Sequence, residues 1–271
     1  MAQQIRFHKM HGAGNDYIYI NNMVYAISRP DEFSVKWSAP HTGIGSDGLV
    51  LIDRSDRADF AMRIFNADGS EAMMCGNATR CIGKYVYEQG LTSKTRVTLE
   101  TLSGVRELRL AVTDDGKVDE VTVDMGHPSF EKQPVEIEAG GKKYTGSVVS
   151  TGNPHFVIFT EDVEAIKLSE VGPLIERHPF FSGRTNVEFA QPLSGSEIRM
   201  RVWERGSGIT QACGTGACAT LVASVNAAKT ARKAVVRADG GSLTVEWDEE
   251  TNTVWMTGEA VMVYEGIIYI T

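Results

Sequence analysis

The sequence predicts a mixed α/β protein of two pseudo-symmetric domains, each a curved mixed or antiparallel sheet wrapped around one central helix. The first observation behind this prediction is an internal repeat at a spacing of 138 residues. Residues 62–65 form a strand-like run that contains an arginine and leads to Cys75, and residues 200–203 lead in the same way to Cys213. A glycine and a helix-like stretch follow each cysteine. Because solenoid repeats are only about 20–50 residues long, a repeat of this length indicates a duplicated domain.

The same spacing holds elsewhere in the chain. Gly14 and Asn15 correspond to Gly152 and Asn153, and both pairs precede an apolar run that contains aromatic residues. The two copies are therefore alike around the cysteines and in these turns. They differ at several polar positions: Asn66 corresponds to Glu204, Ala67 to Arg205 and Gly48 to Asn186.

The second observation is the distribution of strand-like and helix-like segments. Each half contains one long helix-like segment: residues 77–89 carry apolar residues at a spacing of three to four, and residues 215–230 are apolar on most faces, as in a buried helix. A shorter helix is expected over residues 169–177, capped by Ser169. Strand signals dominate the rest, over residues 4–10, 17–21, 48–53, 59–65, 95–101, 105–112, 118–125, 143–150, 155–160, 186–190, 196–203, 233–238, 242–247, 253–257 and 260–270.

A boundary between the two domains is expected where turn-forming residues gather after residue 125. Gly126, Pro128 and Pro134 lie there, and a Gly-Gly pair follows. We therefore expect an N-terminal domain over residues 1–125 and a C-terminal domain over residues 126–262.

Composition limits the possible partners. The 271 residues carry a net charge of −8, which argues against nucleic acid as a partner because phosphate binding requires a basic face. The N-terminal residues lack the apolar core of a secretory signal, and no apolar run reaches the ~20 residues of a membrane span. We therefore expect a soluble cytoplasmic protein that does not bind membranes.

The four cysteines are expected to be free thiols, because the cytoplasm is reducing. Their spacings do not match the common zinc pattern, and we find no phosphate-binding or dinucleotide-binding loop, so no metal site is predicted. Cys81 and Cys218 lie one to two turns into their helices, and we interpret them as core residues. Cys75 and Cys213 should instead lie at helix N-termini, where the helix dipole and free backbone N–H groups stabilise a thiolate.

Two thiols at equivalent positions suit one kind of reaction. A helix N-terminus can also bind a carboxylate, so each copy could hold an amino acid and supply a proton-transfer group. One thiolate would remove the α-proton, and a thiol on the opposite face would return a proton and invert the carbon. This scheme requires no cofactor, and no lysine lies in a recognisable pyridoxal-phosphate context.

Four segments together resemble the diaminopimelate epimerase family. They are residues 8–16, residues 66–71 with the following residues 74–77, residues 152–155, and residues 204–206 with the following residues 212–216. The resemblance covers essentially the whole chain in the family's order. It implies two domains with pseudo-twofold symmetry around a cleft, and a last strand, residues 263–271, that crosses back to the first domain. It also implies cofactor-independent, two-base interconversion of LL- and meso-diaminopimelate, a step toward lysine and peptidoglycan, in an enzyme that often forms homodimers.

The resemblance also implies roles for individual residues. Cys75 and Cys213 would be the acid/base pair, Glu204 would receive an ammonium group and assist one thiol, and His155 would assist the other. Arg205 suits bidentate capture of a carboxylate. The residues implied in substrate binding are Asn15, Asn66, Gly76, Asn77, Asn153, Asn186, Glu204, Arg205, Gly214 and Thr215.

The chain departs from the family pattern in two places. Residues 38–41 read Ser-Ala-Pro-His where members commonly carry Asp-Arg-His, and Gly48 stands where some members carry a glutamine that contacts the substrate. Both departures bear on contacts with the distal end of the substrate rather than on the chemistry.

Two other functions remain open. A two-cysteine racemase of the same fold could act on proline or hydroxyproline, although a cyclic secondary amine has no second zwitterionic end for Glu204 and Arg205 to hold. A redox or structural protein could instead form a reversible disulfide between Cys75 and Cys213. That second function leaves the repeated asparagines unexplained.

Overall fold

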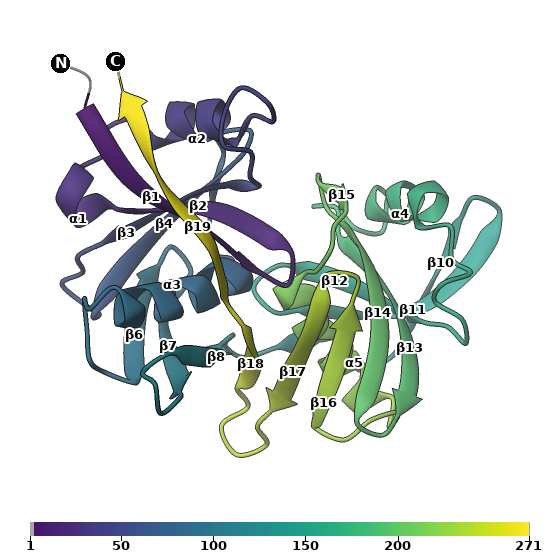
Figure 1. The fold of residues 1–271 in the computed structure, drawn as a ribbon. Helices are drawn as coiled ribbons and strands as arrows, with labels where there is room; N and C mark the ends of the chain where they lie inside the picture. Colours follow the sequence, from purple (N-terminus) through teal and green to yellow (C-terminus); the bar gives the residue numbers. More distant parts are fainter. Residues whose placement is uncertain (1–2, 271) are drawn as a thin grey trace. The chain divides into compact units, whose positions relative to one another are not determined.

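The structure is a computed structural model that describes residues 3–270, and it divides into two compact units (Figure 1). Unit 1 contains the described residues up to Val123 and those from Gly258 onward, and unit 2 runs from Asp124 to Thr257. Unit 2 is thus one continuous segment, whereas unit 1 is formed from both ends of the chain.

Unit 1 is a mixed sheet with helices on both faces. Its strands, in spatial order, are β19 (Val261–Ile270), β1 (Gln3–Gly12), β2 (Asn15–Asn21), β3 (Gly48–Asp53), β4 (Phe60–Asn66), β6 (Arg96–Thr101), β7 (Gly104–Val112) and β8 (Val118–Asp124), and the short β5 (Glu71–Ala72) also pairs with β4. The pairs β2/β3 and β4/β6 are parallel, and the others are antiparallel.

The central helix of unit 1 is α3 (Gly76–Glu88), which packs against β1, β2 and β7. The opposite face of the sheet is covered by α1 (Asn22–Tyr25) and α2 (Pro30–Ser38), which pack on β3 and its neighbours. Alternation along each strand produces this layering, since successive side chains point to opposite faces. The apolar side chains under α2 form one core of Ile5, Phe7, Ile18, Ile20, Ile27, Trp37, Leu49, Leu51 and Phe65.

Unit 2 repeats this arrangement. Its strands, in spatial order, are β10 (Val135–Ala139), β11 (Lys142–Ser150), β12 (Pro154–Phe159), β13 (Asn186–Ser194), β14 (Glu197–Glu204), β16 (Lys233–Ala238), β17 (Gly241–Trp247) and β18 (Val254–Glu259), with the short β9 (Ser129–Phe130) paired to β11 and the short β15 (Gly208–Ile209) paired to β14. The pairs β12/β13 and β14/β16 are parallel.

The helices of unit 2 also repeat those of unit 1. The central helix α5 (Gly214–Asn226) packs on the strands β11 to β14, β16 and β17, and α4 (Leu168–Glu176) covers the other face. Both helices start 138 residues after their counterparts α3 and α2. Equal strand order, equal parallel pairs and equal helix offsets confirm the predicted fold class and the duplication.

Some predicted boundaries are wrong. The N-cap of α4 is Lys167, and it makes no side-chain cap bond, so Ser169 lies inside the first turn rather than capping the helix. Helix α5 ends at Asn226 instead of residue 230, because Ala228 adopts a left-handed conformation at φ 52° that stops the helix. Six further elements are not predicted from the sequence: α1, α2, β10 and the two-residue strands β5, β9 and β15.

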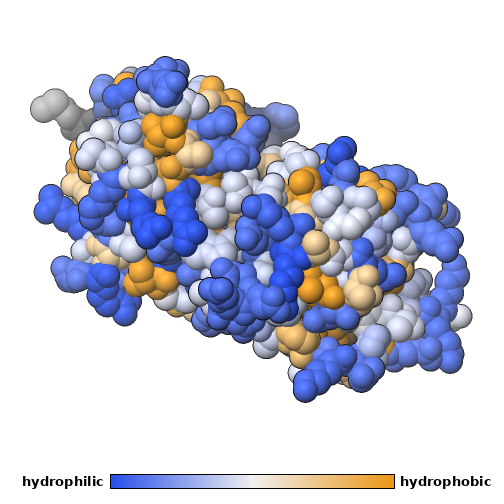
Figure 2. Space-filling view, turned by 90° about the horizontal axis from the view of Figure 1, so that it is seen from below, coloured by the Kyte–Doolittle hydropathy of each residue, from blue (hydrophilic) through white to orange (hydrophobic). Residues whose placement is uncertain are grey.

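The surface carries apolar residues scattered among polar ones on the face drawn in Figure 2. An exception lies along β19, where alternate apolar side chains are exposed: Val263, Ile267 and Tyr269, with Tyr264 beside them. No helix within residues 3–270 is long and apolar enough to cross a membrane.

Candidate active site

Cys75 and Cys213 each occupy the N-cap of a 13-residue helix, which confirms their predicted position. Their backbone angles are nearly equal: φ −137° and ψ 118° at Cys75, and φ −121° and ψ 113° at Cys213. The carbonyl of each accepts the first helical hydrogen bond at 2.9 Å, from Thr79 in one unit and Ala217 in the other. Each thiol therefore lies at the positive end of its helix dipole, beside free backbone N–H groups.

The surroundings of Cys75 are amides and hydroxyls. Its sulfur donates to Oδ1 of Asn15 at 3.3 Å, and Nδ2 of Asn77 donates to the same oxygen at 3.4 Å. The hydroxyl of Tyr17 also bonds to Cys75. Burial, followed by the charge of Cys75, raises the pKa of Tyr17 well above its ordinary value, so this phenol keeps its proton and can donate to a thiolate.

Asp47 holds this group in place, although the sequence analysis did not select it. Its carboxylate accepts from Nδ2 of Asn15 at 2.7 Å and from the backbone N–H of Asp16 at 3.1 Å. Its backbone carbonyl accepts from Ala67 at 2.9 Å, so the turn that contains Asn66 is linked to the same residue. Burial raises the pKa of Asp47, and the bond from Asn15 opposes that shift. Only the folded structure shows this role, because an aspartate before a glycine has the sequence signature of an ordinary turn.

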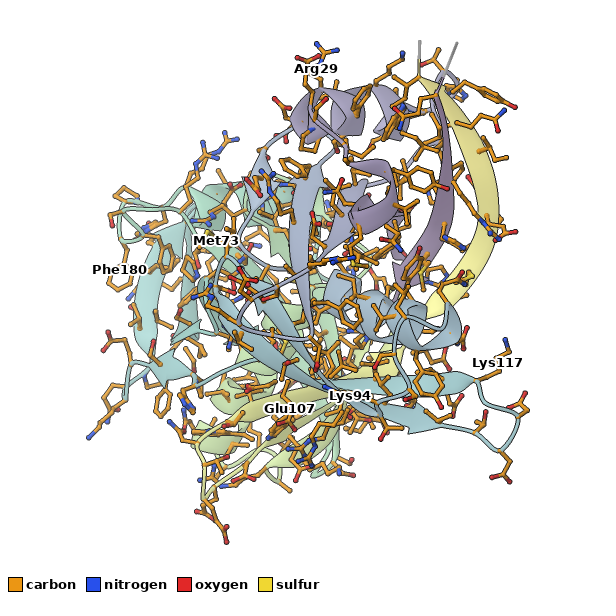
Figure 3. The ribbon with its side chains drawn as sticks, turned by 90° about the vertical axis from the view of Figure 1, so that its left-hand side faces the viewer. Arg29, Met73, Lys94, Glu107, Lys117 and Phe180 are labelled. Atoms are coloured by element: carbon orange, nitrogen blue, oxygen red, sulfur yellow. The ribbon has the colours of Figure 1, made fainter. Side chains whose placement is uncertain are left out.

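The other predicted residues of unit 1 lie nearby in the fold. Gly76 is buried as the first residue of α3, and Nδ2 of Asn66 donates to its own turn, at Ser70 Oγ, at 3.0 Å. Met73, on the loop that leads into Cys75, is 60% exposed (Figure 3). A side chain at Gly48 would begin 2.1 Å from a backbone oxygen of the neighbouring strand β4, so this position cannot hold the glutamine of other members without a backbone shift.

The surroundings of Cys213 are carboxylates and hydroxyls. The sulfur accepts from the backbone N–H of Gly216 at 3.4 Å and lies 3.4 Å from Thr215 Oγ1. The carboxylate of Glu204 bonds to the thiol and also accepts from Thr210 Oγ1 at 2.5 Å. Burial, then the charges of Glu204 and Glu188, raise the pKa of Cys213 well above its ordinary value, so this residue is a thiol at neutral pH.

The predicted residues Asn153 and His155 form a buried chain with Glu188, which the sequence analysis missed. Nδ1 of His155 lies 2.7 Å from Glu188 Oε1, and Nε2 lies 2.9 Å from Asn153 Oδ1. The side chains of His155 and Glu188 have no exposed surface. At the N-terminus of α5, Gly214 is the first helical residue. The hydroxyl of Thr151 donates to the carbonyl of Thr215 at 3.0 Å.

Asn186 and Arg205 belong to a third group in unit 2. Nδ2 of Asn186 donates to the carbonyl of Pro154 at 3.1 Å, and its Oδ1 accepts from the backbone N–H of Arg205 at 2.8 Å. The exposed guanidinium of Arg205 donates to the carbonyl of Gly183 at 3.0 Å. Asn186 therefore fixes the backbone that carries Arg205, while the guanidinium is open to solvent.

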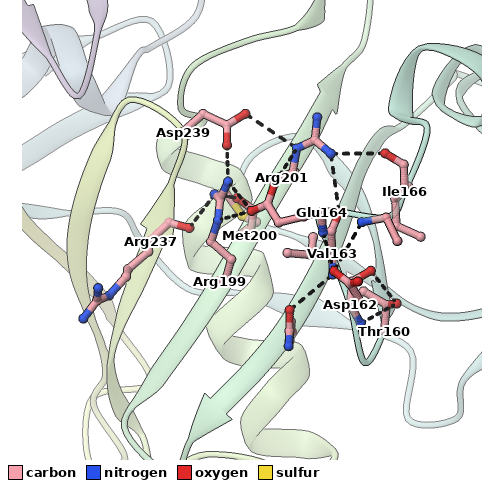
Figure 4. A network of polar contacts seen from close by, with 12 residues as sticks. Thr160, Asp162, Val163, Glu164, Ile166, Arg199, Met200, Arg201, Arg237 and Asp239 are labelled. Atoms are coloured by element: carbon pink, nitrogen blue, oxygen red, sulfur yellow. Dashed lines mark hydrogen bonds and ion pairs between the residues drawn. The ribbon is translucent and has the colours of Figure 1, made fainter.

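A charged network around Arg199, Arg201 and Asp239 lies next to the loop before Cys213; Figure 4 shows the network. Arg199 pairs with Glu164 at 2.8 Å and also with Asp239, and Arg201 donates to the carbonyl of Ile166 at 3.1 Å. The residue after Asp239 donates its backbone N–H to the carbonyl of Gln211 at 2.7 Å, two residues before Cys213. These contacts make Arg201 a structural residue.

Two solved structures share this fold. A hydroxyproline epimerase from Agrobacterium vitis superposes with a TM-score of 0.76 at 17% identity, over 98% of this chain and 92% of that one. A phenazine biosynthesis protein of the PhzF family from Bacillus anthracis gives a TM-score of 0.76 at 16% identity, over 99% and 100% of the two chains. The protein is therefore of the duplicated α/β class in which each sheet encloses a central helix.

Sequence similarity identifies the family within this fold class. The family model for diaminopimelate epimerase matches residues 7–131 and 147–263. A diaminopimelate epimerase of Parabacteroides distasonis is 64% identical over the full length of both chains, and one of Methanococcus maripaludis strain C6 is 51% identical over 98% of this chain and 100% of its own. The chain belongs to the diaminopimelate epimerase family and is an isomerase, as its resemblance to the family predicted.

Proposed function

We propose that the protein interconverts LL- and meso-diaminopimelate without a cofactor, by proton transfer at Cys75 and Cys213. The observation that carries this proposal is the equivalence of the two thiols: each caps the central helix of its unit with the same backbone geometry. The membership of the whole chain in the family supports the choice of substrate. We place this reaction in the cytoplasm, as a step toward lysine and the peptidoglycan crosslink.

The proposed reaction has two proton transfers. One thiolate removes the α-proton, which breaks the C–H bond, forms an S–H bond and leaves the electron pair on the α-carbon. The other thiol gives its proton to the opposite face of that carbon, which forms the new C–H bond and leaves a thiolate. Proton exchange with solvent then restores the starting forms. Thiols placed in this way would supply both the general base and the general acid.

The negative charge that develops on the substrate needs fixed dipoles around it. The N-termini of α3 and α5 offer free backbone N–H groups at Gly76, Asn77, Gly214 and Thr215, and such groups bind carboxylates. In this proposal they hold the carboxylate at the reacting carbon. Asn15, Asn66, Asn153, Asn186, Glu204 and Arg205 hold the rest of the substrate, and the solvent-open guanidinium of Arg205 suits the distal carboxylate.

Isotope exchange tests the proposal directly. The protein is incubated with LL-diaminopimelate in deuterated water. The products are separated on a chiral column, and their deuterium content is measured by mass spectrometry. The expected product is meso-diaminopimelate with one deuterium on one α-carbon. Absence of both inversion and exchange would refute the proposed activity.

A second candidate substrate follows from the fold. Because a hydroxyproline epimerase shares this fold, proline and hydroxyproline are assayed under the same conditions. The carboxylate Glu204 and the cation Arg205 favour an acyclic substrate with a second zwitterionic end, so we expect no turnover of the cyclic amines.

We further propose that the protein forms a homodimer through β19. This strand pairs only with β1 among residues 3–270, so its outer backbone edge is open. Tyr269 and Ile267 are 61% and 53% exposed along that edge. An open apolar edge strand is a site for strand pairing, and a second copy offers the same edge in a twofold arrangement.

Light scattering after size-exclusion chromatography measures the oligomeric state. The wild type is expected at twice the chain mass, and Tyr269→Glu at the chain mass, because a charge on the edge opposes burial. Val24→Glu, at a residue that is 66% exposed elsewhere in unit 1, serves as the matched control. A monomeric wild type would refute this part of the proposal.

A further inference from the structure

Glu188 is a buried carboxylate to which the proposed reaction gives no role. It lies on β13 in the register that pairs it with Val157 of β12, and its side chain has no exposed surface. Its neighbours Val187 and Phe189 belong to the apolar core that includes Leu168 and Ile175 of α4. By strand alternation the side chain of Glu188 therefore points to the other face of the sheet, toward α5.

On that face the carboxylate contacts His155. Oε1 of Glu188 lies 2.7 Å from Nδ1 of the ring, a short distance typical of a charge-assisted hydrogen bond in which the ring N–H donates. On the far side of the ring, Nε2 meets Asn153 Oδ1 at 2.9 Å. Both ring nitrogens face an oxygen, and the two contacts together fix the orientation of the imidazole.

The same carboxylate oxygen lies against the start of the helix that carries Cys213. A side chain on Gly216 would begin 2.8 Å from Oε1 of Glu188, 3.2 Å from Cβ of Cys213 and 3.4 Å from its sulfur. A side chain at this position would therefore force the carboxylate of Glu188 to move. The missing side chain lets a carboxylate, an imidazole and a thiol gather within one buried region of unit 2.

Only one of the two carboxylate oxygens of Glu188 is used in these contacts. Its second oxygen, Oε2, is buried and has no hydrogen-bond partner among residues 3–270. A buried unpaired carboxylate oxygen is costly for the fold, and a core position of a strand would ordinarily carry an apolar residue. Retaining the charge there points to a use for it.

We propose that Glu188 is a positioning residue of the epimerase reaction: its carboxylate orients His155 and, together with Glu204, keeps Cys213 in the thiol form, so that unit 2 is at rest the proton donor. The role of Glu188 in the reaction rests on the proposed function, whereas its effect on the protonation of Cys213 is a property of the protein without substrate. The charged groups that act on Cys213 are Glu204 on β14 and Glu188 on β13, and His155 on β12 contacts Glu188. The two carboxylates oppose a negative charge on the sulfur, and both contribute to the raised pKa of Cys213.

Alkylation of Cys75 and Cys213, the two thiols at helix N-termini, tests this claim without substrate. Iodoacetamide reacts with thiolates, and mass spectrometry reports the modification of each cysteine separately as a function of pH. Cys81 and Cys218 have no exposed surface and should stay unmodified as long as the protein is folded, so they act as an internal control. Cys75, in the other unit, is the reference for any general change in reactivity.

The decisive variant is Glu188→Gln, which keeps the shape of the side chain and removes its charge. We expect the alkylation midpoint of Cys213 to move to lower pH, with a rate at pH 8 that is roughly fivefold higher, while the rate at Cys75 is unchanged. In the epimerase assay kcat should fall with little change in KM, because in this proposal Glu188 acts through His155 and Cys213 and not by binding the substrate. Glu246→Gln is the matched control, since Glu246 is a strand glutamate of unit 2 that pairs with Lys233 at the surface at 2.9 Å.

The outcomes are distinct. Unchanged alkylation of Cys213 in a folded Glu188→Gln protein would overturn the inference, whatever the activity assay shows. If the variant does not fold, the wild type decides: Cys213 must ionise at higher pH in the folded protein than in urea, and an equal or lower midpoint would overturn the inference. If the alkylation midpoint of Cys213 moves to lower pH in Glu188→Gln as expected, but the wild type does not turn over diaminopimelate, the proposed function is refuted. The effect of the Glu188 charge on Cys213 then still holds.

Discussion

The N-termini of α3 and α5 place a thiol in the same backbone geometry but in different electrostatic surroundings. Cys75 contacts the amide of Asn15 and the phenol of Tyr17, whereas Cys213 contacts the carboxylate of Glu204 and lies near that of Glu188. The duplicated fold sets where each thiol lies, and the diverged side chains set how strongly each holds its proton. Duplication and divergence thus act on two separate properties of the site.

This difference matters for a reaction that needs one donor and one acceptor. If both thiols had equal surroundings, nothing in the protein would favour the proton on one sulfur over the other. Carboxylates beside Cys213 favour the thiol there, and hydrogen-bond donors such as Tyr17 beside Cys75 can stabilise a thiolate. The comparison of the two thiols can be tested by removing them, and then by changing each environment.

The largest effect is expected from removing either thiol. Cys75→Ala and Cys213→Ala should each lower kcat for inversion by about 10³-fold or more, because each removes one proton-transfer group. Chiral chromatography measures the product. Cys218→Ala, at a fully buried cysteine of α5, is the control and should retain inversion. Inversion that survives in one of the first two variants would refute the role of that thiol.

The next largest effect is expected at Glu204. Glu204→Gln removes a charge that raises the pKa of Cys213, so that the thiol ionises at lower pH and a smaller fraction of the protein carries the proton to be donated. We expect a loss in kcat on the order of 10²-fold and an alkylation midpoint for Cys213 that moves to lower pH. Glu197→Gln, on the same strand but paired with Arg237, should change neither quantity. An unshifted midpoint would show that Glu204 does not control the thiol.

A smaller effect is expected on the opposite thiol. Tyr17→Phe removes the hydroxyl beside Cys75, which should raise the alkylation midpoint of Cys75 and lower kcat roughly tenfold, the value of one hydrogen bond. Tyr19→Phe is the matched control, because Tyr19 points to the same face two residues later and its hydroxyl lies near Cys81 instead. Equal effects of the two variants would mean that the change acts on packing and not on the thiol.

The smallest effect on activity is expected at Cys81, a thiol inside α3. Burial raises the pKa of Cys81 from 9.0 to about 11. The buried thiol therefore contributes fully to the free energy of unfolding below pH 9, and this contribution is lost as the pH rises through about 11. By pH 10 the loss is about 1.4 kcal/mol. Urea unfolding at pH 8 and pH 10 should show a smaller loss of stability in Cys81→Ala than in the wild type. Equal losses would contradict this prediction.

Much of the fold follows from local patterns in the sequence. Long strands such as β3 and β17 and the central helices α3 and α5 have strong periodicity, and their predicted bounds differ from the structure by only a few residues, except at the end of α5. The repeat also located the two cysteines at helix starts, because a Cys-Gly pair follows a strand and loop in each copy. Short strands such as β5 and β15 were not predicted, since a segment of two residues cannot show an alternation of apolar and polar residues.

The residues around the thiols were harder to predict. Helix α2 had usable signals, a proline at its first position followed by Asp31 and Glu32, but its apolar spacing is weak. Glu188 had none, because in sequence it resembles the solvent-facing residue of an alternating strand. Its burial and its contact with His155 follow from the parallel pairing of β12 with β13, a long-range property that local sequence does not contain.

The pairing of the first and last strands has a consequence for how the protein folds. β1 and β19 join residues such as Gln3 and Ile270, so the sheet of unit 1 closes a loop of nearly the whole chain. Long-range pairs form slowly because the entropy of loop closure must be overcome first. On the ribosome, unit 2 is complete once Thr257 has emerged, whereas unit 1 waits for the final strand. Unit 2 should therefore fold first during synthesis, and a shortened C-terminus should leave β1 as an unprotected edge.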